Sequence, residues 1–138
     1  MGSILNPYIA FKDGKAREAA EFYKSVFGGD LDVNTFGEYG ATHEGLQPEW
    51  VMHGQLSTPS GFTLMVSDAA QTEIAVGDNI SISLSGDDEA ELRGYWDGLT
   101  DGGKVTTPLE KQMWGDVFGM AVDKFGIQWM VNIAGRAG

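Results

Sequence analysis

Apolar and polar residues alternate with a spacing of two in several short stretches of the chain, and this alternation predicts β-strands with one buried face. Residues 6–12 and 79–85 are examples. In the second stretch Ile80, Ile82 and Leu84 alternate with serines. We therefore expect these three apolar side chains to lie under a helix.

Two other segments have apolar residues at spacings of three and four, which predicts amphipathic helices. The first, residues 16–27, is followed by two glycines, which readily adopt the left-handed conformation that ends a helix. The second, residues 88–99, begins with Asp88 and Glu91 at the spacing of a capping box. Gly94 weakens this helix by about 1 kcal/mol relative to alanine, so packing must stabilise it.

An internal repeat with an offset of 65 residues relates the two halves of the chain. The stretch GFTLMVSD, from Gly61, resembles GIQWMVNI, from Gly126, and the same offset pairs Met65 with Met130. Before each copy, a strand, a polar turn, a helix, two glycines and another strand follow one another, which predicts two βαβββ modules. The predicted boundaries are residues 4–75 and 76–134 for the modules and 1–138 for the single domain that they form.

Strand parity divides the side chains of these modules between two faces. Leu64, Val66, Trp129 and Val131 are expected beneath the helices. The opposite face, which we call the cup, has serines, amides, methionines and a tyrosine, a mixture that suits a ligand site better than a dry core. The predicted ligand-binding residues in or beside the cup are Tyr8, His53, Gln55, Met65, Ser81, Ser83, Trp114, Phe118, Met120 and Met130.

Composition narrows the classes of partner. The net charge of −11, from 20 acidic and 9 basic residues, repels nucleic acids and anionic membranes and favours a basic or zwitterionic ligand, although solubility alone also explains an acidic chain. The absence of cysteine excludes disulfides and thiolate ligands. No apolar run approaches the length of a membrane span and the start lacks a signal-peptide pattern, so we predict a cytoplasmic protein.

Three stretches, PYIAFKDGKAREAAEFYKSVFGG, VMHGQLSTPSGFTLMVSD and PLEKQMWGDVFGMAVDKFGIQWMV, resemble the PhnB-like group of the vicinal oxygen chelate superfamily. The resemblance covers nearly the whole chain. It implies an α+β fold in which two βαβββ modules form a curved mixed sheet with helices on the convex side, and it implies a homodimer. The superfamily includes glyoxalase I, extradiol dioxygenases and drug-resistance proteins, so the resemblance does not decide the function.

The resemblance also implies where a metal would bind. Metal-dependent members hold a divalent ion with four His, Glu or Gln side chains, one from the first and one from the last strand of each module. Here the last-strand positions fall on Met65 and Met130, and the first-strand positions on Tyr8 and on Ser81, or on Ile82 if the register is shifted by one residue. Thioethers and neutral hydroxyls are poor ligands for such ions, so we expect no metal and no other cofactor.

The two histidines are the remaining candidates for chemistry. His53 is expected in the cup, where it could act as an acid or base, contact a ligand or have a structural role. His43 and Glu44 lie in a stretch with glycines and a proline, which predicts a loop. Trp114 could form a wall of the cup or belong to the core.

These observations lead to three functional hypotheses. The first is a metal-independent small-molecule-binding protein that holds its ligand in the cup. The alternative is an enzyme of the lyase, isomerase or oxygenase type, in which His53 acts as acid or base or holds a non-canonical metal together with a loop carboxylate. The third is a dimeric scaffold whose cup is filled by its own side chains. The sequence leaves open whether the protein is an enzyme.

Overall fold

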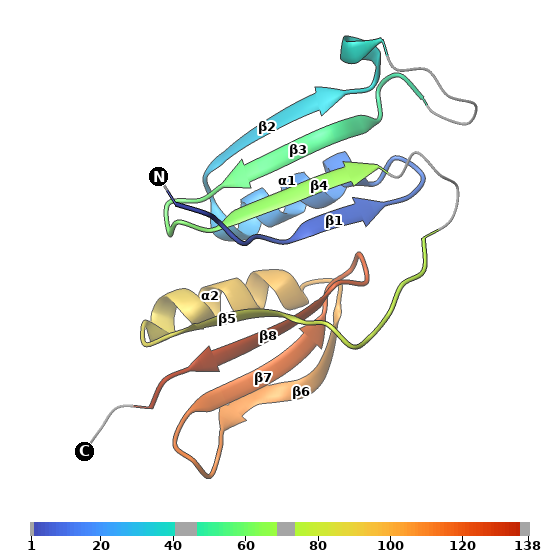
Figure 1. Cartoon of the computed structure of the whole chain (residues 1–138). Coiled ribbons are helices and arrows are strands. Elements are labelled where there is room, and N and C mark those ends of the chain that lie inside the picture. Colours follow the sequence, from blue (N-terminus) through green and yellow to red (C-terminus); the bar gives the residue numbers. More distant parts are fainter. Residues whose placement is uncertain (1, 41–46, 69–73, 136–138) are drawn as a thin grey trace. The chain divides into compact units, whose positions relative to one another are not determined.

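A computed structural model describes residues 2–40, 47–68 and 74–135. The chain divides into two compact units, Met1–Ala75 and Val76–Gly138 (Figure 1). Each unit has the element order βαβββ, so the predicted α+β class with two such modules is confirmed. His43 and Glu44 lie outside the described residues, and the single-domain organisation stays a prediction. None of the helices in the described part of the chain is long and apolar enough to cross a membrane.

The N-terminal unit contains a four-stranded mixed sheet in the order β1-β4-β3-β2. The strand β1 is parallel to β4, and the other neighbours are antiparallel. The helix α1 lies against one face of this sheet (Figure 1). Its elements are β1 (Tyr8–Phe11), α1 (Ala16–Phe27), β2 (Asp30–Thr35), the short 3-10 helix η1 (Gly37–Tyr39), β3 (Val51–Ser57) and β4 (Thr63–Asp68).

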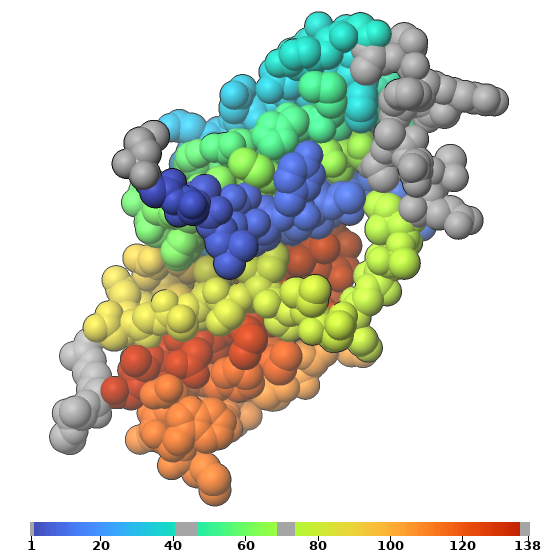
Figure 2. All heavy atoms as spheres, in the orientation of Figure 1, coloured from blue at the N-terminus to red at the C-terminus, as the bar shows by residue number. Residues whose placement is uncertain are grey.

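The C-terminal unit repeats this arrangement with the strand order β5-β8-β7-β6. Here β5 is parallel to β8, and α2 packs against β5, β7 and β8. Figure 2 shows the heavy atoms of both units as spheres on the face seen in Figure 1. The elements are β5 (Ile82–Gly86), α2 (Glu89–Thr100), β6 (Lys104–Lys111), β7 (Val117–Val122) and β8 (Gln128–Ile133).

Equivalent hydrogen bonds occur at the 65-residue offset of the repeat. Between β3 and β4, the Thr58 N–H donates to the Phe62 carbonyl at 3.0 Å. Between β7 and β8, the Asp123 N–H donates to the Ile127 carbonyl at 2.8 Å. Each turn includes a glycine with positive φ, a conformation that costs a side-chain-bearing residue free energy. The repeated sequence therefore encodes the same turn twice.

The predicted core positions on the last strand of each unit are confirmed. Leu64 and Val66 in β4 and Trp129 and Val131 in β8 are all buried. The prediction for Ile80 is wrong, because Ile80 precedes β5 and 78% of its surface is exposed. The alternating pattern thus began before the strand did.

The two helices are capped at their N-termini in different ways. In α1 the cap comes from the end of β4, where the buried Asp68 accepts hydrogen bonds from the N–H groups of Ala16, at 3.0 Å, and Val51, at 2.8 Å. In α2 the cap is local, as predicted, because the Asp88 carboxylate accepts from the Glu91 N–H at 3.1 Å. Both satisfy N–H groups that the first turn of a helix leaves without an intrahelical partner.

Candidate functional site

The cup face of the N-terminal unit is organised around Met65 in β4. Strand pairing places Tyr8 of β1 on one side of Met65 and Gln55 of β3 on the other. Directly paired residues share a sheet face, and His53 shares the face of Gln55 because it lies two positions earlier in β3. The structure therefore brings together four of the predicted site residues of this unit on one face.

His53 and Tyr8 are in direct contact on this face. The His53 Nδ1 lies 3.4 Å from the Tyr8 hydroxyl oxygen, which is a long hydrogen bond. The two rings are tilted by 51°, with 5.7 Å between their centroids. Tyr8 keeps 56% of its surface exposed, and His53 is half-buried. The contact orients the imidazole and leaves its Nε2 without a hydrogen-bond partner among the described residues.

The edge strand β2 adds polar residues that the sequence reasoning missed. Asn34 pairs with His53, and Asp32 pairs with Gln55, so both belong to the cup face. The alternation of Asp30, Asp32 and Asn34 with apolar residues was a usable signal. The pairing that places them beside the predicted residues depends on tertiary structure, so the alternation alone could not reveal it.

The cup face of the C-terminal unit is less polar. Met130 of β8 pairs with Met120 of β7, and Phe118 pairs with Asn132. On the other side Met130 pairs with Ser83 of β5. Ser81, which we predicted at the first-strand position, precedes β5, so the equivalent of Tyr8 is Ser83. The predicted position, Ser81, lies two residues before the observed one, because the alternating pattern predicts a strand that starts before Ile82.

The residues at the four positions where the resemblance implies metal ligands do not fit a divalent ion. In the corrected register these positions hold Tyr8, Met65, Ser83 and Met130, two hydroxyls and two thioethers. Hard and borderline divalent ions prefer imidazole and carboxylate ligands. Across residues 2–40, 47–68 and 74–135, no group of three or more His, Asp or Glu side chains is placed to hold a metal.

Trp114 lies in the turn between β6 and β7, not in the core. The Gln112 N–H donates to the Asp116 carbonyl at 2.7 Å, and Trp114 keeps 62% of its surface exposed. The Asp116 carboxylate accepts from the Asn132 side-chain amide at 3.0 Å and from the Gly135 N–H at 2.7 Å. These two hydrogen bonds lower the pKa of the Asp116 carboxyl, and the bond from Asn132 has the larger effect. They also attach the turn to the end of β8.

The chain matches the model of the 3-demethylubiquinone-9 3-methyltransferase family over residues 4–132. It is 34% identical to protein PA1353 from Pseudomonas aeruginosa; this crystal structure covers 96% of this chain and 98% of its own, with a TM-score of 0.78. It is 27% identical to Protein YjdN from Escherichia coli (strain K12), over 94% of each chain.

Two further structures show the fold at lower identity. A putative 3-demethylubiquinone-9 3-methyltransferase, PhnB protein, from Bacillus cereus is 21% identical over 96% of this chain and 100% of its own, with a TM-score of 0.74. A glyoxylase/bleomycin resistance protein/dioxygenase domain from Frankia sp. EAN1pec is 13% identical over 100% of this chain and 95% of its own, with a TM-score of 0.68. The chain belongs to the 3-demethylubiquinone-9 3-methyltransferase family.

Proposed function

We propose that this protein binds a small molecule on its cup faces without a metal ion. The observation that carries the proposal is the presence of Met65 and Met130 where metal-dependent members of the superfamily place ligands, each beside a hydroxyl-bearing residue, Tyr8 or Ser83. A thioether holds such ions weakly but adapts well to irregular organic ligands.

The surrounding chemistry supports a ligand site. Small-molecule sites combine apolar side chains with a few polar groups that fix orientation. The N-terminal cup face combines Met65 with Tyr8, His53 and Gln55, and the C-terminal one combines methionines and Phe118 with serine and asparagine. Ser81 and Trp114 remain predicted contacts beside these faces.

Elemental analysis of the purified protein tests the metal-free part of the proposal. We expect no stoichiometric zinc, nickel, manganese or iron. The matched variant Tyr8→His/Met65→Glu introduces an imidazole and a carboxylate on the neighbouring strands β1 and β4, on the face that also holds His53, and it should retain more zinc than the unmodified protein. One tightly held ion per unmodified chain, lost on substitution of Met65 or Met130, would overturn the proposal.

Protein-observed NMR with a library of small polar and aromatic compounds tests the binding part. We expect at least one compound to shift the resonances of cup residues such as His53 or Met130. The same compounds should leave helix residues on the other face of each sheet unaffected. A library that shifts no cup resonance in either unit would contradict the proposal.

An enzymatic role for His53 is the second candidate. The contact between the His53 Nδ1 and the Tyr8 hydroxyl favours it, because general bases are commonly oriented by a second side chain. The name of the family refers to a methyl transfer, for which an acceptor hydroxyl would need such a base. Turnover of a substrate that His53→Ala abolishes while binding persists would support this role, and equal turnover by the variant would remove it.

We also propose that the protein is a cytoplasmic homodimer, as the resemblance to its superfamily implies. Light scattering on the purified protein should give twice the chain mass of 14.9 kDa. A mass of one chain across the measured concentrations would contradict the dimer. Cell fractionation tests the location.

A further inference from the structure

The two modules differ in chemistry at equivalent cup positions, and this difference points to a selective site in the N-terminal unit. The 65-residue offset pairs His53 with Phe118 and Gln55 with Met120. Each pair occupies the same place in its sheet, because Gln55 is opposite Met65 and Met120 is opposite Met130. The shared fold therefore does not require polar residues at these positions.

The Tyr8–His53 contact fixes which hydrogen bonds the N-terminal face can offer. If the tyrosine donates to the imidazole Nδ1, the Nε2–H remains a donor and the phenol oxygen an acceptor. If Nδ1–H donates to the phenol oxygen, the phenol O–H is the free donor and Nε2 the acceptor. In both arrangements the neutral pair presents one donor and one acceptor to a ligand.

Gln55 supplies a second acceptor on the same face. Its side-chain N–H donates to the Ser57 hydroxyl oxygen at 3.4 Å. The Gln55 carbonyl oxygen therefore remains able to accept a hydrogen bond from a ligand. A group with both a donor and an acceptor, such as a carboxamide, matches this set.

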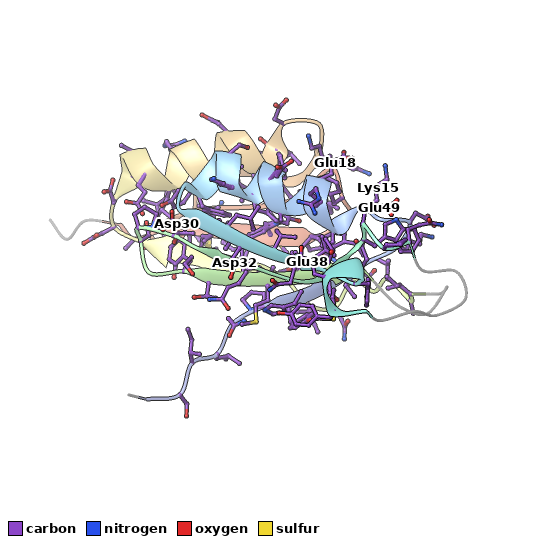
Figure 3. All side chains as sticks on the ribbon, turned by 90° about the horizontal axis from the view of Figure 1, so that it is seen from above. Lys15, Glu18, Asp30, Asp32, Glu38 and Glu49 are labelled. Atoms are coloured by element: carbon purple, nitrogen blue, oxygen red, sulfur yellow. The ribbon has the colours of Figure 1, made fainter. Side chains whose placement is uncertain are left out.

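The charges of the N-terminal sheet oppose an anionic ligand. The strands β1, β2, β3 and β4 contain no lysine or arginine. On the cup face, Asp32 is opposite Gln55 and Asp30 is opposite Ser57, both along β2 (Figure 3). The third carboxylate, Asp68, lies buried and accepts the two backbone hydrogen bonds described above. A bound carboxylate, phosphate or phosphonate would find no lysine or arginine on these four strands, and it would face the two like charges of β2.

We propose that the N-terminal cup face, formed by Tyr8, His53, Gln55 and Met65, binds an uncharged planar group that both donates and accepts hydrogen bonds, and that it rejects anions. The thioether of Met65, between Tyr8 and Gln55, provides an apolar surface for the flat side of such a group. This inference rests on the proposed ligand-binding function and adds the class of group recognised.

Benzamide and benzoate form a matched pair of probes, because they have nearly the same shape and differ in charge. Titrations at about pH 8, where imidazoles are ordinarily neutral, would follow the His53 and Met65 resonances of the labelled protein by NMR. We expect benzamide to shift these resonances and benzoate to bind at least about tenfold more weakly. Benzoate binding as tight as benzamide at these resonances would overturn the proposal.

The internal repeat supplies the variants. His53→Phe/Gln55→Met gives the N-terminal face the residues that the C-terminal face has at these positions, so the variant should fold. It should lose the benzamide preference. The control Phe118→His changes the equivalent position of the other unit and should leave the N-terminal shifts intact. Retained benzamide preference in the double variant would refute the assignment of these residues.

The outcomes separate this inference from the proposed function. Failure of both probes at His53 and Met65, with library compounds still shifting Met120 or Met130, would refute the N-terminal site and leave ligand binding standing. Failure of every compound at both faces would refute the proposed function itself.

Discussion

The buried carboxylate of Asp123 adapts the repeated turn of the C-terminal module to the large side chain of Trp129. It accepts hydrogen bonds from the N–H groups of Phe125, at 2.8 Å, and Ile127, at 3.1 Å, and from the indole of Trp129, at 2.9 Å. In the first module the equivalent residue is Thr58, and the position of Trp129 holds a leucine, which needs no acceptor. The C-terminal module therefore has an aspartate at position 123 because the tryptophan at position 129 needs a hydrogen-bond acceptor.

Replacing Asp123 with the threonine of the first module should destabilise the protein. The Trp129 indole N–H would be left buried without its acceptor, and two turn bonds would be weakened, at a total cost of about 2–4 kcal/mol. Urea unfolding of Asp123→Thr measures this cost. In Trp129→Leu the same substitution should cost less, because the indole is gone; an equal cost in both backgrounds would contradict the coupling.

The lowered pKa of Asp116 predicts that the free energy of unfolding decreases as the pH falls into the acidic range. Because the folded state favours the charged carboxylate, the contribution of Asp116 is fully present above the ordinary aspartate pKa and is lost as the pH falls through the lowered pKa. Urea unfolding below about pH 5 should show a smaller loss of stability with acid in Asp116→Asn than in the unmodified protein. Identical pH profiles would contradict this assignment.

At the scale of elements, local features were predicted and non-local pairing was not. The cap at Asp88 and the end of α1 before Gly28 depend on neighbouring residues, and both are confirmed. The start of β5 depends on its parallel pairing with β8, which the sequence does not encode locally. The alternating pattern therefore predicts a strand that includes Ile80 and Ser81, whereas β5 begins at Ile82.

The same division applies to the site. Parity correctly placed Tyr8, Met65 and Gln55 on one face, because alternation needs only one known position in a strand. It did not reveal that the Tyr8 hydroxyl reaches His53, because these side chains come from strands that are not neighbours in the sheet. Nor did it reveal Asp32, whose neighbours depend on the pairing of β2 with β3.

Two glycines of the C-terminal unit should respond oppositely to the same substitution. Gly94 lies in α2 with nothing within 4 Å of an added Cβ, so Gly94→Ala should stabilise the protein by about 1 kcal/mol. At Gly119 in β7 an added Cβ would lie 2.8 Å from the Leu109 Cα and 2.8 Å from the Trp96 ring, so Gly119→Ala should destabilise by about 1–3 kcal/mol.

Chemical denaturation of both variants gives the comparison. Gly94→Ala serves as the control for the general effect of alanine on the unfolded chain. A stabilising Gly119→Ala would show that β7 can move away from Trp96 without cost.

For the whole molecule, the net charge of −11 predicts a dependence of stability on salt. Like charges repel in the compact state, and added salt screens them. The exposed ion pairs Lys15–Glu18, at 3.8 Å (Figure 3), and Arg93–Glu89, at 2.8 Å, are of a kind that contributes little, so screening them removes little attraction.

The midpoint of thermal unfolding should therefore rise by a few degrees between roughly 0.01 M and 0.15 M sodium chloride. Light scattering at both concentrations controls for a change in association. A midpoint that falls with salt would show that specific attractions outweigh the excess of negative charge.

The capping of α1 by Asp68 has a consequence for the order of folding. The bond from Ala16 to Asp68 spans 52 residues, whereas the bond from Glu91 to Asp88 spans three. Closing the longer loop costs more chain entropy and delays the contact that depends on it. We expect pulsed hydrogen exchange during refolding to protect the amides at the start of α2 before that of Ala16. The two copies of one module would then acquire their structure at different times.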